Sequence, residues 1–331
     1  MRFAAFLLIL SGSFPLFSAE EIASPTSLDI GDFLKRGDFS FLQPAASGRT
    51  ESASFGMVRN GGTRFHEGVD VKSVRKMDGG VPMDVVRAVC AGTVAHVSPL
   101  NNGSYGRYVV LIHENGGVQL YTLYAHLLAV SPSLKEGDRV PAGAVLGMLG
   151  RTSTAVRIEK NAAHLHFEVG MMLGEKGFEN WYRRRYGPGN LHGVCNGFNL
   201  AGADPLDFFA FHFDGKELRF REWIASQKKA FSVRLPMPEE TPSLAARSPA
   251  LKRFGKNGVK SCVVDFTWFG MPLAFRNSDV VGNADVEVFD VDAASVGLAE
   301  KRGILSAVEG GHVPGSTLKN YLEIIFDRRF P

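Results

Sequence analysis

Short β-rich runs separated by glycine turns dominate the pattern of hydrophobic and polar positions between about residues 51 and 209. The runs lie at 85–89, 92–97, 108–113, 118–127, 144–148 and 164–169. Frequent short strands with Gly and Pro between them are typical of antiparallel sheets, whereas a βαβ fold would alternate strands with helices. The run Tyr108–Ile112 is apolar on both faces, which indicates a central strand. The pattern therefore predicts a mainly β fold, an antiparallel β-sandwich or half-barrel over residues 51–209.

A small C-terminal α+β module is predicted over residues 251–331. Strand character is present at 262–275 and 285–290, and a helical stripe is predicted to follow an N-cap at Ser316. The stripe consists of Leu318, Tyr321, Leu322 and Ile325. Residues 210–250 are predicted to hold a helix and an exposed linker, because four prolines fall between 232 and 250. The module contains no chemical motif, so its role stays open.

The N-terminus has the features of a signal peptide. Arg2 precedes an apolar stretch, Phe3–Phe17, which is followed by Ser18-Ala19-Glu20. We expect residues 1–19 to be removed, residues 20–50 to form an N-terminal extension, and the protein to be exported to the periplasm, cell wall or exterior. The stretch is shorter than the ~20 apolar residues that a spanning helix needs, which argues against a stable membrane span. Bulky Phe17 leaves open another cleavage point or retention as an anchor.

Two short histidine motifs point to metal chemistry. In the first, His66-Glu67-Gly68-Val69-Asp70, the glycine and the valines disfavour a helix. We expect His66 to leave a loop and Asp70 to begin a strand, with Gly68 allowing the backbone to turn so that both side chains reach one metal. In the second motif, strand alternation places His164 and His166 on one face, about 6–7 Å apart, while Leu165 and its apolar neighbours enter the core.

A third histidine motif is predicted to line the same groove. It lies on the strand Tyr121–Leu127, where alternation would give Thr122, Tyr124 and His126 one shared face.

These motifs resemble those of the lysostaphin/LytM-type zinc metallopeptidases, whose pattern is His-x-Gly-x-Asp, Tyr-x-His-Leu and His-x-His-Phe-Glu. The resemblance covers roughly residues 51–209 and includes Gly103–Leu111, Gly137–Val140 and Asp204-Pro205-Leu206. It implies the duplicated hybrid motif fold and an endopeptidase that cuts peptide cross-links of bacterial peptidoglycan.

Residue by residue, the resemblance implies that His66, Asp70 and His166 bind one zinc ion, with His126 and His164 as the catalytic pair. Three protein ligands leave the fourth tetrahedral position for water, whose pKa zinc lowers to about 7. Imidazoles can orient this water and move its proton near neutral pH.

The chain departs from the family pattern in two segments, 154–163 before His164 and 171–203 after the His-x-His strand. The second is too long for a minimal connection and is predicted to form a roof over the groove. Candidate substrate-binding residues are Tyr124, Trp181, Tyr182, Arg183, Arg184, Arg185 and Tyr186.

Charge and cysteine content add little to this interpretation. A formal net charge of +3 on 331 residues does not indicate nucleic-acid binding, although it suits a polyanionic wall as partner. Three cysteines exclude a disulfide scaffold; Cys90 is predicted to be buried, and a Cys195–Cys262 bridge stays open. A non-hydrolytic peptidoglycan-binding or amidase-activating protein on the same fold is the alternative function. The sequence leaves open which bond is cut, which organism's wall is the target and whether the protein has a protein partner.

Overall fold

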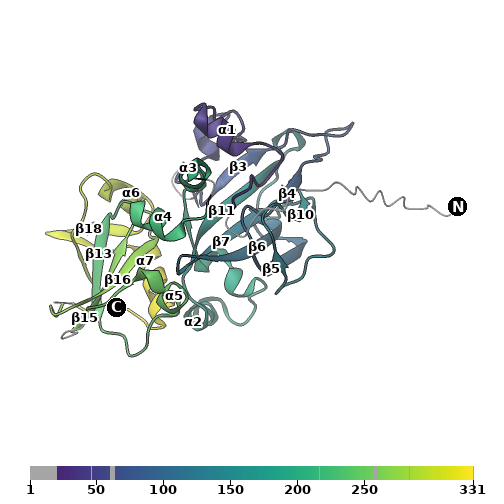
Figure 1. The fold of residues 1–331 in the computed structure, drawn as a ribbon. Coiled ribbons are helices and arrows are strands. Elements are labelled where there is room, and N and C mark those ends of the chain that lie inside the picture. The colour runs from purple at the N-terminus through teal and green to yellow at the C-terminus, as the bar shows by residue number, and fades with distance from the viewer. Residues whose placement is uncertain are drawn as a thin grey trace.

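The computed structural model describes residues 21–45, 47–59, 64–215, 217–255, 260–282 and 284–330. The predicted signal peptide lies outside the described residues. None of the described helices is long and apolar enough to cross a membrane. Two β-rich halves lie side by side, with α2 and α5 below the line where they meet (Figure 1).

The main sheet of the N-terminal half has seven strands among the described residues, in the order β12-β11-β7-β6-β5-β9, with β3 also pairing with β11. They are β3 (Val69–Lys72), β5 (Gly92–Asn102), β6 (Gly106–Asn115), β7 (Val118–Ala125), β9 (Arg139–Val140), β11 (His164–Met172) and β12 (Leu200–Ala203). Every pairing in this sheet is antiparallel, as predicted. The apolar run Tyr108–Ile112 lies in β6, between β5 and β7, which confirms the predicted central strand.

Register shifts in β5 curl this sheet into the predicted half-barrel. They fall between Val94 and His96 and between Ser98 and Asn102, and such bulges increase the local twist. A smaller antiparallel sheet and a two-stranded one complete this half. They comprise β4 (Val85–Arg87), β8 (Ala129–Val130) and β10 (Val145–Met148), and β1 (Val58–Arg59) and β2 (Arg64–Phe65).

The C-terminal half has the predicted α+β character. Its five-stranded sheet, counted over the described residues, has the order β14-β16-β15-β13-β17. The elements are β13 (Phe231–Pro236), β14 (Lys252–Arg253), β15 (Ser261–Phe266), β16 (Pro272–Ser278), β17 (Glu287–Phe289), α6 (Val296–Lys301), β18 (Leu305–Val308), β19 (Gly311–Pro314) and α7 (Ser316–Phe326). The predicted apolar stripe of α7 is buried, but Gly315 is its N-cap and Ser316 its first residue.

The exposed linker predicted at 232–250 is not present. Phe231–Pro236 forms the inner strand β13, and α5 (Ser243–Arg247) and a 3-10 turn (Pro249–Leu251) pack against the first half. Leu244 and Leu251 are buried. The prolines are compatible with this order, because Pro236 ends a strand, Pro242 and Pro249 stand at the start of helical turns, and Pro238 lies in the loop between them.

The two halves share one continuous cluster of buried apolar side chains. At the junction, α2 (Lys176–Tyr186) packs against α7 so closely that a Cβ on Gly177 would lie 2.1 Å from the carbonyl oxygen of Ile324. The remaining helices are α1 (Ile30–Lys35), α3 (Pro205–Gly215) and α4 (Phe220–Ser226), and single 3-10 turns lie at Thr50–Ala53, Lys160–Ala162, Gly193–Cys195 and Gly197–Asn199. Division of the chain into domains at the predicted boundaries stays a proposal.

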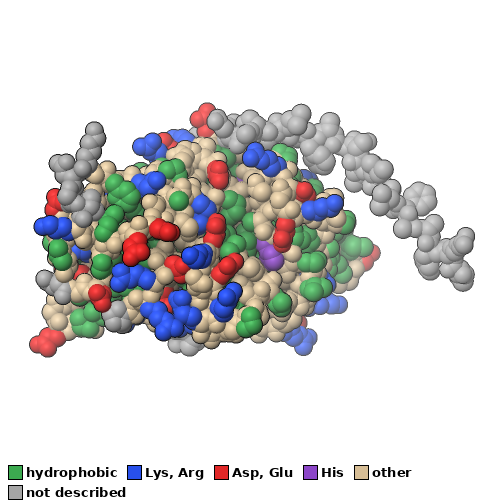
Figure 2. Space-filling view, turned by 90° about the horizontal axis from the view of Figure 1, so that it is seen from below, with side chains coloured by type: hydrophobic (Ala, Val, Ile, Leu, Met, Phe, Trp, Pro, Cys, Tyr) green, Lys and Arg blue, Asp and Glu red, His purple; other side chains and the backbone are tan. Residues whose placement is uncertain are grey.

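Positive and negative side chains are interspersed on the face seen in Figure 2, without a large area of one sign. All three cysteines are buried free thiols, so the possible Cys195–Cys262 bridge is not formed.

Candidate metal centre

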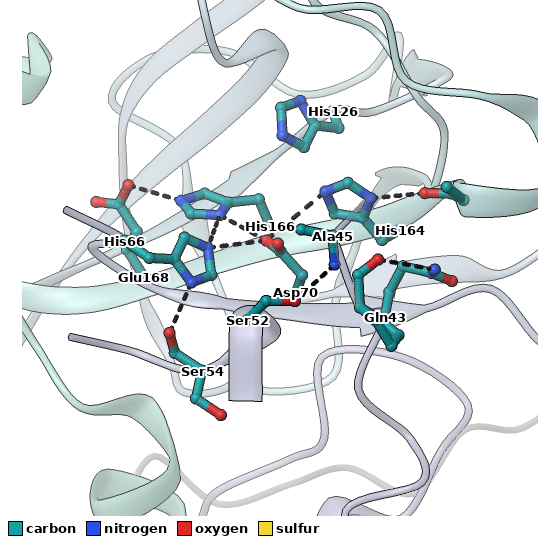
Figure 3. A network of polar contacts seen from close by, with 12 residues as sticks. Gln43, Ala45, Ser52, Ser54, His66, Asp70, His126, His164, His166 and Glu168 are labelled. Carbon is teal, nitrogen blue, oxygen red and sulfur yellow. Dashed lines mark hydrogen bonds and ion pairs between the residues drawn. The ribbon is translucent and has the colours of Figure 1, made fainter. Parts of the chain in front are cut away.

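Three donor atoms from β3, β11 and the loop before β3 converge at one end of the main sheet (Figure 3). His66 Nε2 lies 3.1 Å from Asp70 Oδ1 and 3.2 Å from His166 Nδ1, and the last two atoms are 2.9 Å apart. In a tetrahedral site with metal–ligand distances of about 2.0–2.1 Å, ligand atoms are separated by roughly 3.3 Å. The triangle therefore has nearly the size that one zinc ion requires. All three side chains are buried.

The far side of each imidazole is held by a hydrogen bond. His66 Nδ1 donates to the carbonyl oxygen of Ser54 (2.8 Å), and His166 Nε2 donates to Glu168 Oε1 (2.9 Å). Tyr121 in turn donates its hydroxyl proton to Glu168 Oε2 (3.0 Å). These bonds fix the tautomers so that the lone pairs of His66 Nε2 and His166 Nδ1 point at the centre. Two nitrogens and one carboxylate oxygen form the ligand set of an open zinc site, so the residues fit the metal that the sequence implies.

Strand register explains why the two motifs meet. His166 stands directly opposite Asp70 in the β3–β11 pair. Leu165 and Phe167 enter the core, as the alternation predicts. Gly68, expected to provide a turn, has a different role: its backbone does not have a positive φ, and a Cβ there would lie 2.2 Å from the carbonyl oxygen of Phe167. The glycine is required because the loop approaches β11 closely.

His126 and His164 form a second pair beside the triangle, with ring centroids 4.9 Å apart. Their Nδ1 atoms donate to the carbonyl oxygens of Thr152 (2.8 Å) and Ala162 (2.7 Å), which leaves both Nε2 atoms as acceptors. His164 Nε2 lies 3.6 Å from Asp70 Oδ1, so it faces the triangle. His126 has a φ of 62°, a conformation that is rare for non-glycine residues and typical of functional positions.

Three pKa shifts describe the charge of the site. Burial alone would lower the pKa of His166, but its hydrogen bonds to Asp70 and Glu168 raise it to about 9, so a metal bound at Nδ1 would displace a proton. Burial, together with the charges of His164 and His166, lowers the pKa of His126 well below the ordinary imidazole value. Burial alone would raise the pKa of Asp70, but the neighbouring His164 and His66 hold it well below its ordinary value. At neutral pH the site therefore presents a neutral His126 and an ionised Asp70.

A cavity of about 600 Å³ opens onto these five residues. The N-terminal extension forms part of the cavity wall, because Gln43 and Ala45 line the cavity (Figure 3). The backbone N–H of Gln43 donates to the carbonyl oxygen of Asp70 (2.8 Å). The backbone N–H of Lys72 donates to the carbonyl oxygen of Phe41 (2.9 Å). The extension therefore pairs with β3, which its sequence, lacking a clear period, did not indicate.

None of the predicted substrate-binding residues lines the metal cavity. Tyr124 is buried in the core, where its hydroxyl accepts a hydrogen bond from the Val89 amide (2.9 Å), so it does not line the metal cavity. The alternation fails because β7 ends at Ala125 and the chain turns at His126. Trp181 and Tyr182 line a second cavity of about 490 Å³.

The other aromatic and basic residues of α2 line neither cavity. Arg184 pairs with Glu323, Arg185 lies over the Trp181 ring, Tyr186 stacks on Phe198, and Arg183 is exposed.

Sequence analysis did not identify Glu168 or Tyr121, which position His166. Glu168 was within reach of the strand pattern, because it lies two residues after His166 and therefore on the same face. Tyr121 lies on another strand, and its role depends on the fold. Glu67, which the first motif places beside His66, points instead to Arg302, whose Nη2 lies 2.8 Å from Glu67 Oε1.

Comparisons with known proteins identify peptidases that this chain resembles. The family model for peptidase family M23 matches residues 64–176. Among solved structures, the catalytic domain of the antimicrobial peptidase lysostaphin from Staphylococcus simulans is 30% identical, over 35% of this chain and 76% of that one, with a TM-score of 0.26. A zinc-containing peptidase from Vibrio cholerae is 23% identical, over 39% of this chain and 35% of that one, with a TM-score of 0.27.

A catalytic-domain mutant of the prophage-encoded M23 protein EnpA from Enterococcus faecalis is 22% identical, over 32% of this chain and 68% of that one, with a TM-score of 0.25. None of the curated proteins matches this chain. The family model and the 30% identity to the lysostaphin domain, over 76% of its length, agree on one family. On these matches, the chain belongs to peptidase family M23.

Proposed function

We propose that the chain is a zinc-dependent endopeptidase that hydrolyses peptide cross-links of bacterial peptidoglycan. The observation that carries the proposal is the convergence of His66, Asp70 and His166 beside the paired imidazoles of His126 and His164. When bound, zinc lowers the pKa of water to about 7 and polarises a carbonyl oxygen as a Lewis acid.

The residues of the chain divide the remaining work. His66, Asp70 and His166 would hold one zinc ion, and Ser54 and Glu168 would keep the imidazoles in the required tautomer. Because the Nε2 atoms of His126 and His164 are acceptors, either can take a proton from the attacking water and return it to the leaving amine. No carboxylate base is needed, and Glu67 is engaged by Arg302.

Export belongs to the same proposal, since peptidoglycan lies outside the cytoplasm. A non-hydrolytic peptidoglycan-binding or amidase-activating protein is the competing function. Such a protein has no need of two acceptor imidazoles beside a complete ligand set, so the geometry favours hydrolysis.

Digestion of purified peptidoglycan, followed by mass spectrometry of the released fragments, tests the function and identifies the bond. We expect cross-linked dimers to decrease with the zinc-loaded protein and to persist with a chelator. A folded, zinc-loaded protein that binds peptidoglycan without releasing fragments would support the competing function.

A further inference from the structure

A second cavity, of about 490 Å³, lies between the metal end of the main sheet and the C-terminal half. Its walls come from four segments far apart in sequence: Glu67 in the loop before β3, the turn 102–105, α2 with the loop after it, and the region of α6 and α7. It adjoins the metal centre, because Glu67 follows His66 and the Tyr105 ring lies 6.0 Å from the His166 ring. Its volume is in the range of small-ligand sites.

The charges that line this cavity cancel. Arg302 donates to Glu67 (2.8 Å) and to the hydroxyl of Tyr321 (3.3 Å), and its guanidinium lies over the Phe65 ring, 4.1 Å from the centroid. An incoming carboxylate would find Arg302 already paired and would meet the carboxylate of Glu67. The cavity therefore favours a ligand without net charge.

Hydrogen-bonding groups remain available around the cavity. Trp181 Nε1 and Arg302 Nε have no acceptor among the residues that the structure describes, but both atoms are fully buried and do not face the open cavity. The side-chain amides of Asn102 and Asn320 line the cavity, and within the described chain they make no hydrogen bond. Each of these amides offers both donors and an acceptor, so the pair suits a ligand that carries hydroxyl and amide groups.

Aromatic rings complete the lining. Tyr182 is partly buried, and Phe198 is half exposed and stacks on Tyr186 with ring centroids 5.5 Å apart. Aromatic faces pack well against flat C–H surfaces. The cavity therefore suits a ligand that has a flat C–H surface, hydroxyl and amide groups around it, and no net charge. An N-acetylated amino sugar has all three properties.

We propose that this cavity binds an uncharged N-acetylated amino sugar of the glycan strand while the attached peptide reaches the metal centre. The inference rests on the proposed function for its substrate, but binding at the cavity can be measured without hydrolysis. It gives the C-terminal half a direct role in substrate recognition through Arg302 and Asn320.

Calorimetric titration of the full chain with triacetylchitotriose tests the binding step. This trisaccharide carries N-acetylated sugars and neither peptide nor carboxylate. We expect saturable binding that Asn102→Ala and Asn320→Ala each weaken about tenfold. Asn101→Ala is the matched control, because Asn101 is exposed, adjacent in sequence and outside the cavity. Absence of binding by the folded wild-type chain, or equal loss in all three variants, overturns the inference.

Hydrolysis of two cross-linked substrates separates the inference from the proposed function. One substrate keeps its disaccharides, and the other is the same peptide dimer after removal of the sugars. We expect kcat/KM to be about tenfold higher with the sugars, and Asn320→Ala to abolish this preference, whereas the control Asn101→Ala should keep it.

Equal rates on both substrates overturn the inference and leave the endopeptidase intact. If neither is cleaved, the proposed function fails, and trisaccharide binding still decides the cavity's ligand. Asn102→Ala and Asn320→Ala could instead weaken binding of the bare, carboxylate-bearing peptide and leave trisaccharide binding unchanged. That result would show that the cavity binds the peptide and not the sugar.

Discussion

Glu168 should control zinc affinity without touching the metal. Its Oε1 accepts the Nε2 proton of His166 at 2.9 Å, its Oε2 accepts a hydrogen bond from Tyr121 at 3.0 Å, and the side chain is 1% exposed. Glu168→Ala leaves a buried imidazole N–H without an acceptor and frees the ring to rotate. Glu168→Gln keeps an acceptor of the same shape and loses only the negative charge.

Loss of such a supporting group typically costs 10- to 100-fold in metal affinity, or about 1.4–2.7 kcal/mol. Because the contact is short and buried, we expect Glu168→Ala to weaken zinc binding about 100-fold and Glu168→Gln to weaken it about tenfold. Tyr121→Phe removes only the bond to Oε2 and should have the smallest effect of the three. This order follows from the number and charge of the contacts that each variant loses.

Zinc affinity can be measured by competition with a chelator of known affinity, with thermal denaturation of the metal-free proteins as the check on folding. Glu175→Gln is a suitable control, because Glu175 is an exposed carboxylate outside the metal centre. Zinc binding by a folded Glu168→Ala variant as tight as wild type would refute the reasoning.

Five further changes test the site and the packing of the chain. His166→Ala should abolish stoichiometric zinc in elemental analysis, and full occupancy would contradict the ligand set. His126→Ala and His164→Ala should keep zinc and lose 10²- to 10⁴-fold in hydrolysis, whereas near wild-type turnover in both would exclude the catalytic pair. Gly68→Ala should lose about 1–3 kcal/mol in denaturant unfolding, because its Cβ would lie 2.2 Å from a β11 carbonyl oxygen; Gly189→Ala, with open space around it, is the control. Deletion of residues 231–331 should give an aggregating or unfolded chain in gel filtration and circular dichroism, since α2 packs on α7, and a folded fragment would contradict the shared core.

Local periodicity predicted the parts of the fold that depend on neighbouring residues. The strands of the main sheet and the apolar stripe of α7 follow directly from alternation and from helical spacing. His164 and His166 share a face for the same reason. Tyr124 shows where this reasoning ends: alternation holds only inside a strand, and the left-handed conformation of His126 turns the histidine away from the face that Tyr124 occupies.

Contacts between distant segments were outside the reach of sequence patterns. The extension around Gln43 pairs with β3 through backbone atoms, which carry no sequence signal. Proline content predicted an exposed linker before β15, but prolines are equally compatible with strand ends and first turns, and the apolar residues between them decided the outcome.

The same limit applies to the role of the C-terminal half. Judged by its composition, it has no clustered catalytic residues, and Arg302 looks like an ordinary surface cation. Docking of α7 against α2 brings Arg302 to Glu67, one residue from a metal ligand, and closes the second cavity. A residue without a motif thus acquires a place beside the site only through tertiary packing. We therefore expect substrate selection in this chain to depend on the C-terminal half, while the peptidase half supplies the groups that hydrolyse the bond.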